Sequence, residues 1–313
     1  MGLYEDLKAI EPFSLSCHND PDGLYSATML RRIFKVKEPI ELPPFNEYKT
    51  DVAVDLGFPS DIEWSGIVVD HHPDHPEERK YKLYWDYCPT GLILYKHLRE
   101  HIKKEDMWLV VGSLMGDGQP ELTPEEVWKS NPVLLKGRGY LYPGQWGKLS
   151  LSATPLYIFL SSGVNSLCRL GFPQEALNVL GNMTDPVQLL ENEVVRDASE
   201  TMRKEEKAVY DQRPLVETFG NYTLVRIKTS KPQIKLCGLI ASKLLGQDGT
   251  NTFIVLNEIS GEISLRGNLA KYYATKMSNA GFKAGGHAKY CGAHIELKDI
   301  DKFVEFVRLM DDI

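Results

Sequence analysis

The sequence lacks the cysteine pattern of a disulfide-bonded protein or a thiolate zinc protein. Its five cysteines (17, 88, 168, 237 and 291) are odd in number, widely scattered, and form no Cys-x-x-Cys pair. Such a set provides neither a disulfide framework nor the paired thiolates of a structural zinc site. We therefore expect a reducing, cytoplasmic environment.

The sequence also lacks long apolar runs and an excess of basic residues. No basic region precedes an apolar core near residue 1, and no apolar run reaches the length of a bilayer span, so we expect neither export nor a membrane partner. The net charge of −7 argues against a protein that coats duplex DNA by bulk electrostatics. A metal-dependent nuclease remains compatible, because bound cations reverse the local sign of a carboxylate cluster.

The chain has the length and apolar content for two folded domains, with 313 residues of which 42% are hydrophobic. Its first part alternates strand-like patterns (13–17, 51–56, 67–70) with helical patterns (24–34, 92–101, 104–115). This order predicts an α/β fold with a largely parallel sheet flanked by helices.

A helical pattern over residues 173–212 separates this part from a second alternating region. There we predict strands at 222–227, 252–256 and 262–266, and helices at 235–245, 270–280 and 300–310. The predicted domains are a catalytic domain at 1–185, a helical linker at 186–213, and a smaller α/β substrate-binding domain at 214–313.

Polar residues stand where several predicted elements end. The run Ile67-Val-Val-Asp70-His71-His72 places an acid and two histidines at the carboxyl end of a strand, where open α/β sheets bind ligands. A hydrogen-bonded strand terminus is the structural alternative. Further acids follow in His18-Asn-Asp20-Pro-Asp22-Gly, at Asp55 and at Asp117. The Asp-Pro-Asp-Gly segment is also typical of a turn with a helix cap.

Carboxylate and imidazole ligands without cysteine suit Mn²⁺ or Mg²⁺ better than a soft-ligand metal. Six such ligands are enough for two ions about 3.5–4 Å apart, bridged by a carboxylate and a water. We therefore expect two Mn²⁺ ions as cofactors, with Mg²⁺ as the alternative.

These motifs, together with Gly285-Gly286-His287, resemble the motif series of the DHH phosphoesterase superfamily, in particular its compact archaeal RecJ-like branch. The resemblance spans nearly the whole chain. It implies one ion held by His18, Asp20 and Asp55, and a second held by Asp22, Asp55, His71 and Asp117. It also implies that His72 donates to the scissile phosphate. Asp70 would act mainly by holding the ligands from the second coordination shell, or as a weaker metal ligand.

The resemblance extends to substrate-binding residues. Asn165-Ser-Leu-Cys-Arg169-Leu-Gly is similar to a RecJ segment whose arginine holds phosphate. The Gly-Gly-His segment, preceded by Ser264-Leu-Arg266, resembles the C-terminal domain of the nuclease and phosphatase branch. A tight turn is the structural alternative for Gly-Gly-His. Residues 136–148 interleave cations with aromatics, which suits nucleic acid or an ordinary loop equally. The implied substrate-binding residues are Asn165, Arg169, Ser264, Arg266, Gly285, Gly286 and His287.

The implied activity is that of a Mn²⁺-dependent exonuclease, which releases nucleotides from single-stranded DNA or RNA by two-metal hydrolysis, with a role in DNA repair. Other substrates fit the same metal chemistry: short oligoribonucleotides, 3′-phosphoadenosine 5′-phosphate and cyclic dinucleotides. A non-catalytic replication-associated binding protein is the alternative from another class. The sequence leaves open whether the chain forms a homodimer and whether it has a replication or repair partner.

Overall fold

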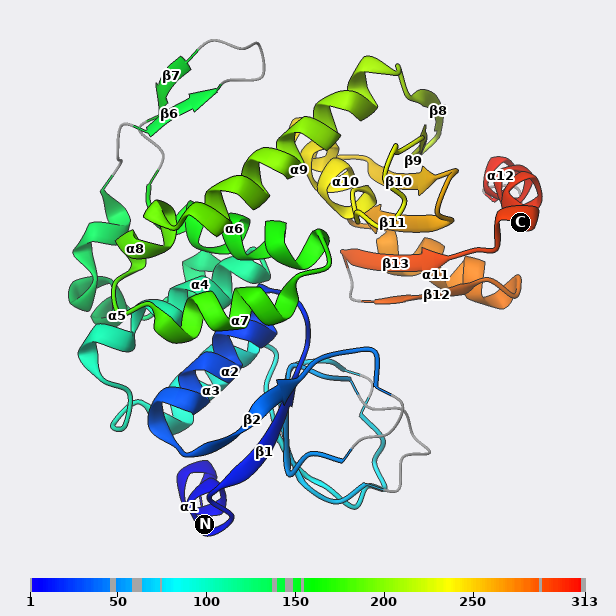
Figure 1. Cartoon of the computed structure of the whole chain (residues 1–313). Coiled ribbons are helices and arrows are strands. Elements are labelled where there is room, and N and C mark those ends of the chain that lie inside the picture. The colour runs from blue at the N-terminus through cyan, green and yellow to red at the C-terminus, as the bar shows by residue number, and fades with distance from the viewer. Residues whose placement is uncertain are drawn as a thin grey trace. The chain divides into compact units, whose positions relative to one another are not determined.

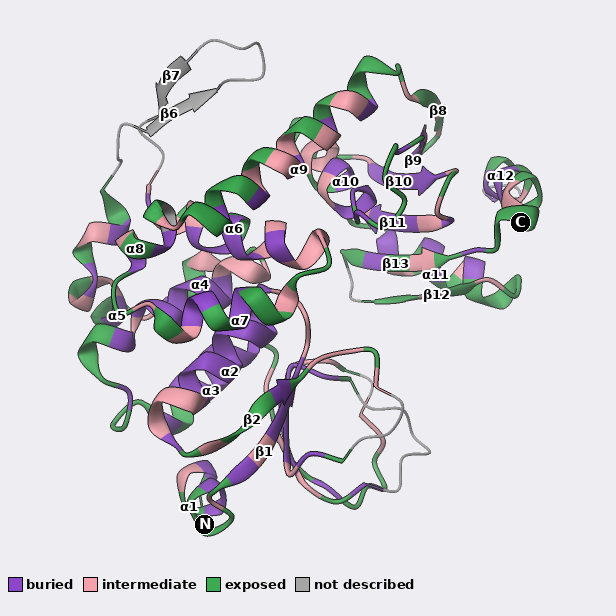
Figure 2. Cartoon of the chain, in the orientation of Figure 1, coloured by how far each residue is buried: buried purple, intermediate pink, exposed green. Residues whose placement is uncertain are grey.

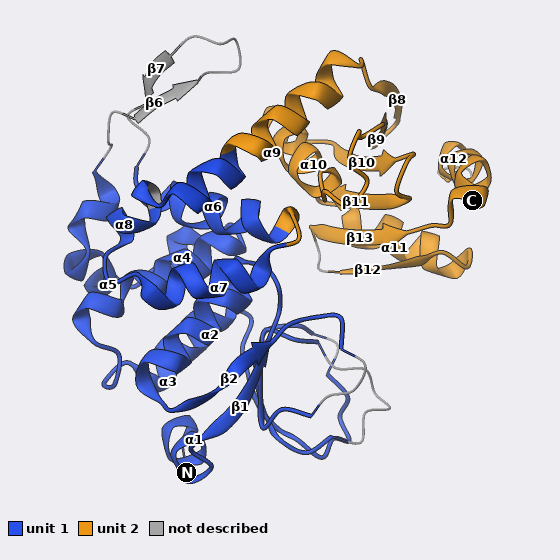
Figure 3. Cartoon of the chain, viewed as in Figure 1, with its two compact units in different colours: residues 1–168, 172–199 blue, residues 169–171, 200–313 orange. Residues whose placement is uncertain are grey.

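The computed structural model describes residues 2–45, 49–57, 64–73, 75–136, 140–143, 149–152, 155–286 and 289–310. Contacts divide the chain into two compact units, coloured separately in Figure 3: residues 1–168 with 172–199, and residues 169–171 with 200–313. The division after residue 199 falls inside helix α9 (Glu193–Asp211), which lies within the predicted linker.

The first unit is built on a parallel sheet with the strand order β2-β1-β3-β4-β5 (Figure 1). Its strands are β1 (Phe13–Cys17), β2 (Val36–Glu41), β3 (Val52–Val54), β4 (Ile67–Asp70) and β5 (Lys82–Trp85). Every residue of β3 and β4 is buried, as expected for the central strands of a parallel sheet. The carboxyl ends of β1, β3 and β4 therefore meet at one edge of the sheet.

Helices pack against the strands of this sheet. They include α2 (Pro21–Ile33), which contacts β1, β2 and β3, and α3 (Thr90–Leu98), which contacts β4. Helices α4 (Trp108–Gly116) and α7 (Pro173–Asn182) pack on α2. Glycine allows close approach here, because a Cβ on Gly91 would lie 2.2 Å from the Ser113 hydroxyl and one on Gly112 2.4 Å from the Tyr25 ring.

A separate apolar cluster packs around the middle of the same sheet. Phe45, Trp64 and Tyr81, which follow strands β2, β3 and β4, pack with Ala53 of β3 and Val68 of β4. The remaining helices and strands of this unit are α1 (Leu3–Ala9), α5 (Glu125–Ser130), β6 (Tyr140–Pro143), β7 (Leu149–Ser152), α6 (Tyr157–Arg169) and α8 (Pro186–Glu191).

The second unit contains a mixed sheet with the order β12-β13-β11-β10-β9-β8. Its strands are β8 (Leu215–Phe219), β9 (Tyr222–Ile227), β10 (Thr252–Asn257), β11 (Glu262–Arg266), β12 (Lys283–Gly286) and β13 (Tyr290–His294). Helix α10 (Cys237–Gln247) shares one buried cluster with β9, β10 and α9. Helices α11 (Ala270–Asn279) and α12 (Ile300–Arg308) share the other, and Figure 2 shows these strands and helices carrying buried residues.

The structure confirms the predicted fold class, a parallel sheet with helices followed by a smaller α/β domain. The prediction missed both edge strands of the first sheet. The β2 strand contains Pro39 and is mostly exposed, and β5 is only partly buried, so neither shows a clear apolar run. The predicted helix 104–115 is in fact a short 3₁₀ turn (Lys104–Asp106) followed by α4. Among the described helices, none has the length and apolar character needed to cross a membrane.

Candidate metal centre

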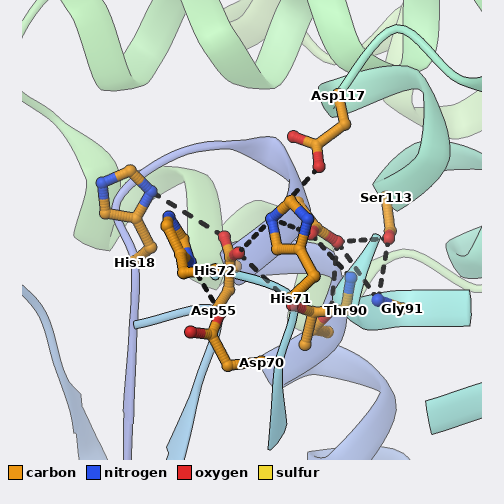
Figure 4. A network of polar contacts seen from close by, with 12 residues as sticks. His18, Asp55, Asp70, His71, His72, Thr90, Gly91, Ser113 and Asp117 are labelled. Atoms are coloured by element: carbon orange, nitrogen blue, oxygen red, sulfur yellow. Dashed lines mark hydrogen bonds and ion pairs between the residues drawn. The ribbon is translucent and has the colours of Figure 1, made fainter. Parts of the chain in front are cut away.

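The carboxyl edge of the first sheet brings the predicted ligands together (Figure 4). His18 follows β1, Asp55 follows β3, and Asp70 ends β4, directly before His71 and His72. Helix ends supply the other acids, because Asp20 caps α2, Asp22 lies in its first turn, and Asp117 follows the last residue of α4.

Asp22 is completely buried and is held in place by the start of α3. Its Oδ2 accepts a hydrogen bond of 2.8 Å from the Thr90 amide, and its Oδ1 accepts one of 3.2 Å from the Gly91 amide. The Ser113 hydroxyl of α4 also donates to Oδ1. Amides at a helix N-terminus favour a negatively charged partner, so these donors fix a carboxylate at this position.

Asp55 occupies the centre of the site. Its backbone is left-handed, with a φ of 58°, a conformation that Asp tolerates better than most residues. Oδ1 lies 3.3 Å from Nε2 of His71, and Oδ2 lies 3.8 Å from Nδ1 of His18. The two oxygens thus lie near histidines that follow different strands, so Asp55 could contribute one oxygen to each of two ligand groups.

Three groups of side chains place their ligating atoms within 4.8 Å of one another. The first contains His18, Asp20 and Asp55, and the second contains Asp22, His71 and Asp117. The third contains Asp55, Asp70, His71 and His72. A hard divalent cation is bound by oxygen and imidazole ligands of this kind, so the donor set fits Mn²⁺ or Mg²⁺.

The buried carboxylates of the site repel one another. Burial raises the pKa of Asp55 well above its usual value, and the neighbouring carboxylates of Asp22, Asp20 and Asp117 raise it further. Burial and the carboxylates of Asp22, Asp20 and Asp70 also raise the pKa of Asp117. Burial lowers the pKa of His71, which favours the neutral imidazole that binds metals. A bound cation would relieve the repulsion among these carboxylates.

A second hydrogen-bond chain lies behind His72. Nδ1 of His72 lies 2.7 Å from Oδ1 of Asp70, and Nε2 of His75 lies 2.7 Å from Oδ2 of the same carboxylate. The Tyr81 hydroxyl lies 2.8 Å from Nδ1 of His75. Although burial raises the pKa of Asp70, its two histidines lower it below its usual value. The carboxylate therefore stays ionised and orients both rings.

The sequence analysis missed three residues that contact the site, namely His75, Thr90 and Ser113. Thr90 donates from its hydroxyl to Oδ1 of Asp55 at 3.3 Å, besides the amide bond to Asp22. A third histidine three residues after the pair was a visible signal for His75. Ser113 lies inside an apolar helix, and only the packing of α4 on α2 shows its role.

The predicted substrate-binding residues lie outside this metal cluster. Asn165 lies on α6, Ser264 and Arg266 lie on β11, and Gly285 and Gly286 lie on β12. His287 and most of the stretch 136–148 fall outside the described residues or have undescribed side chains.

Two of the predicted arginines converge in the second unit. A Cβ on Gly238 would lie 3.1 Å from Nη2 of Arg266 and 3.2 Å from Nη1 of Arg169. Burial and the nearby Arg169 lower the pKa of Arg266 to about 10. Its buried Nε has no hydrogen-bond partner among the described residues. Two cations close together with an unsatisfied donor form a site that suits an anion.

Solved structures resemble this chain in fold, whereas comparisons of its sequence with known proteins find no match. No protein-family model matches the chain, and no curated protein matches it. RecJ from Thermus thermophilus, solved with Mn²⁺, is similar with a TM-score of 0.66 and 15% identity, over 97% of this chain and 52% of RecJ. The chain thus spans about half the length of that RecJ.

Two further structures cover most of both chains. An exonuclease RecJ bound to manganese has a TM-score of 0.61 and 15% identity, over 97% of this chain and 90% of that chain. The pGpG-specific phosphodiesterase PggH from Vibrio cholerae has a TM-score of 0.51 and 15% identity, over 94% and 97%. The chain therefore shares the fold of the solved RecJ structures, as the resemblance to the DHH phosphoesterase superfamily predicts.

Proposed function

We propose that the chain is a metal-dependent phosphodiesterase that releases nucleotides from the ends of single-stranded DNA or RNA. The observation that carries the proposal is the convergence of three potential ligand groups around Asp55 at the carboxyl edge of the first sheet. The fold shared with RecJ structures supports it. Radiolabelled single strands of defined polarity and length, incubated with Mn²⁺ or Mg²⁺, test it. A failure to hydrolyse any phosphoester would overturn it.

The proposed ligands are those given by the motifs: His18, Asp20 and Asp55 for one ion, and Asp22, Asp55, His71 and Asp117 for the other. Two such ions, when bound, supply a water nucleophile at neutral pH and neutralise charge on the phosphate. The chain's own contribution is preorganisation, since Thr90, Gly91 and Ser113 hold Asp22 before any ion arrives.

His72 is the proposed donor to the scissile phosphate. Because Asp70 accepts from Nδ1, donation to the phosphate falls to Nε2, the other ring nitrogen. The Asp70 contact orients the His72 ring so that Nε2 is the nitrogen left for the phosphate oxygens, where charge develops during hydrolysis.

Hydrolysis of a linear dinucleotide is the second candidate, favoured by the similarity to PggH over 97% of that chain. Comparing kcat/KM on pGpG with that on oligonucleotides of increasing length separates the two candidates. A value that falls with length favours the dinucleotide. Mn²⁺ as the preferred ion, a cytoplasmic location, a homodimer and a replication or repair partner remain predictions.

The arginine pair in the second unit is proposed to hold a substrate phosphate other than the one attacked. Arg266→Ala should lower kcat/KM on oligonucleotides about 10- to 100-fold, the value of one charge-assisted hydrogen-bonding group. The loss on bis(p-nitrophenyl) phosphate, which lacks a second phosphate, should be much smaller. Arg266→Lys should not restore the rate, because an ammonium does not reproduce the guanidinium fork. Equal losses on both substrates would place Arg266 in the chemical step instead.

His75 is proposed as a positioning residue for Asp70 and His72. His75→Ala leaves Oδ2 of buried Asp70 without its histidine donor, and such supporting contacts are worth about 10- to 100-fold in activity. His75→Gln, which retains an N–H donor, should recover part of the loss. The effect should fall on kcat rather than KM, since His75 supports the phosphate donor. Unchanged kinetics in His75→Ala would contradict this role.

A further inference from the structure

An aromatic pair lies where β5 ends and the connection to α3 begins. Trp85 ends β5 and pairs with Asp70 in the strand register. The Trp85 indole Nε1 donates a hydrogen bond of 2.7 Å to the backbone carbonyl of His72. The ring of Tyr87 lies 4.3 Å from that of Trp85, at an interplanar angle of 71°. The pair is thus attached directly to the backbone of the proposed phosphate donor.

Both ends of this segment are anchored at the metal centre. Trp85 holds the carbonyl of His72, and Thr90 donates to Asp22 and Asp55. Only residues 86–89 lie between these two anchors. The position of Tyr87 is therefore fixed relative to the metal ligands of the same unit, without reference to the second unit.

The segment is also braced from within. The Asp86 carboxylate accepts hydrogen bonds from the Tyr87 amide at 2.7 Å and from Nζ of Lys96 at 2.6 Å. Lys96 also lies 3.4 Å from the Cys88 sulfur. These contacts fix the backbone on either side of Tyr87. A held backbone lowers the entropy cost of binding a ligand against the ring.

The tyrosine ring nevertheless contacts little protein. Tyr87 is 81% exposed, the highest fraction among the exposed large hydrophobic residues of the described chain, and Trp85 is 36% exposed. An aromatic ring contributes binding energy mainly when another surface covers it. An exposed ring on a fixed backbone is therefore available to a ligand. Flat aromatic surfaces bind nucleobases by stacking, because every base presents a π-face.

We propose that Trp85 and Tyr87 form a stacking platform for a nucleobase of the substrate next to the scissile phosphate. The inference rests on the proposed function and adds a base-binding subsite to it. It predicts that the enzyme senses the presence of a base but hardly its identity, because stacking is tolerant of sequence.

The test uses the full-length protein and oligonucleotides that carry a normal or an abasic residue at the terminal or penultimate position. The wild-type protein should prefer the normal strand about 5- to 150-fold in kcat/KM, the range that stacking on one aromatic provides. Tyr87→Ala should lose this preference, and Tyr87→Phe should keep it, since the phenyl ring still stacks. Tyr210→Ala, an exposed tyrosine of α9, is the matched control and should keep it.

A binding measurement makes the result independent of catalysis. Anisotropy of the same fluorescein-labelled strands with metal-free protein in EDTA should show weaker binding of the abasic strand by wild type but not by Tyr87→Ala. Circular dichroism checks folding, which an exposed side chain hardly affects. Base-dependent binding without any hydrolysis would overturn the proposed function and support the platform. Two results would overturn the platform. One is that the wild-type protein binds or hydrolyses normal and abasic strands equally well, and the other is that Tyr87→Ala keeps the wild-type preference for the normal strand.

Discussion

Asp55→Asn should abolish hydrolysis and the binding of at least one metal ion. Asp55 is the only residue that belongs to both proposed ligand sets, and an amide supplies neither the charge nor the second anionic oxygen. Asparagine is preferable to alanine because it tolerates the left-handed backbone at this position, where φ is 58°. Elemental analysis of dialysed protein and calorimetric titration with Mn²⁺ measure the loss without an activity assay.

Asp55→Asn should also change how the Tm of the protein depends on Mn²⁺. Burial and the neighbouring carboxylates raise the pKa of Asp55, so the fold disfavours a negative charge at this position. A neutral amide there should keep or raise the metal-free Tm. The rise in Tm that Mn²⁺ gives the wild-type protein should disappear, because a ligand stabilises only the state that binds it. A variant that retains turnover and the Mn²⁺-dependent rise would contradict the dinuclear assignment.

His72→Ala should lower kcat about 10²- to 10³-fold, the size expected when one preorganised donor to developing charge is removed. Its metal content should remain intact, because Asp70 keeps its hydrogen bond to His75 and the proposed ligand sets do not include His72. His71→Ala provides the matched control. Its Nε2 lies 3.3 Å from oxygens of both Asp55 and Asp117, so its loss should reduce metal binding.

The two adjacent histidines therefore separate metal binding from phosphate activation. If His72→Ala loses metal on elemental analysis, the ring is a ligand and our assignment is wrong. If both variants lose kcat but keep full metal content, neither ring binds an ion. A phosphorothioate substrate offers a second readout. If His72 donates to one non-bridging oxygen, replacing that oxygen with sulfur should lower the wild-type kcat for one phosphorothioate diastereomer more than for the other. His72→Ala should abolish this difference between the diastereomers.

The central strands could be predicted because burial on both faces imposes continuous apolar runs. β1 and β4 appear at the predicted residues, and β3 lies within the predicted 51–56. The ends of these strands then locate the acids and histidines. Edge strands escape this reasoning, since β2 and β5 each have a solvent-exposed side and a mixed composition.

The polar support of the site was harder to predict for a different reason. The Asp22 carboxylate accepts hydrogen bonds from the backbone amides of Thr90 and Gly91. Because every residue except proline has such an amide, the sequence does not indicate which amides will serve as donors. Ser113 reaches Asp22 only because glycine lets the helices approach closely. Trp85 ends an edge strand that the periodicity did not reveal, and Tyr87 follows that strand. Such contacts depend on tertiary packing, which local sequence does not encode.

The buried carboxylate cluster also links the lifetime of the protein to the supply of metal. Asp22, Asp55 and Asp117 all have raised pKa values in the metal-free fold, so without a cation the folded chain carries an unfavourable charge density. Each occupied site adds stabilisation that grows with the free ion concentration. We therefore expect the protein to unfold more often and to be degraded sooner in a metal-starved cell. Its abundance would then follow the availability of the proposed ion.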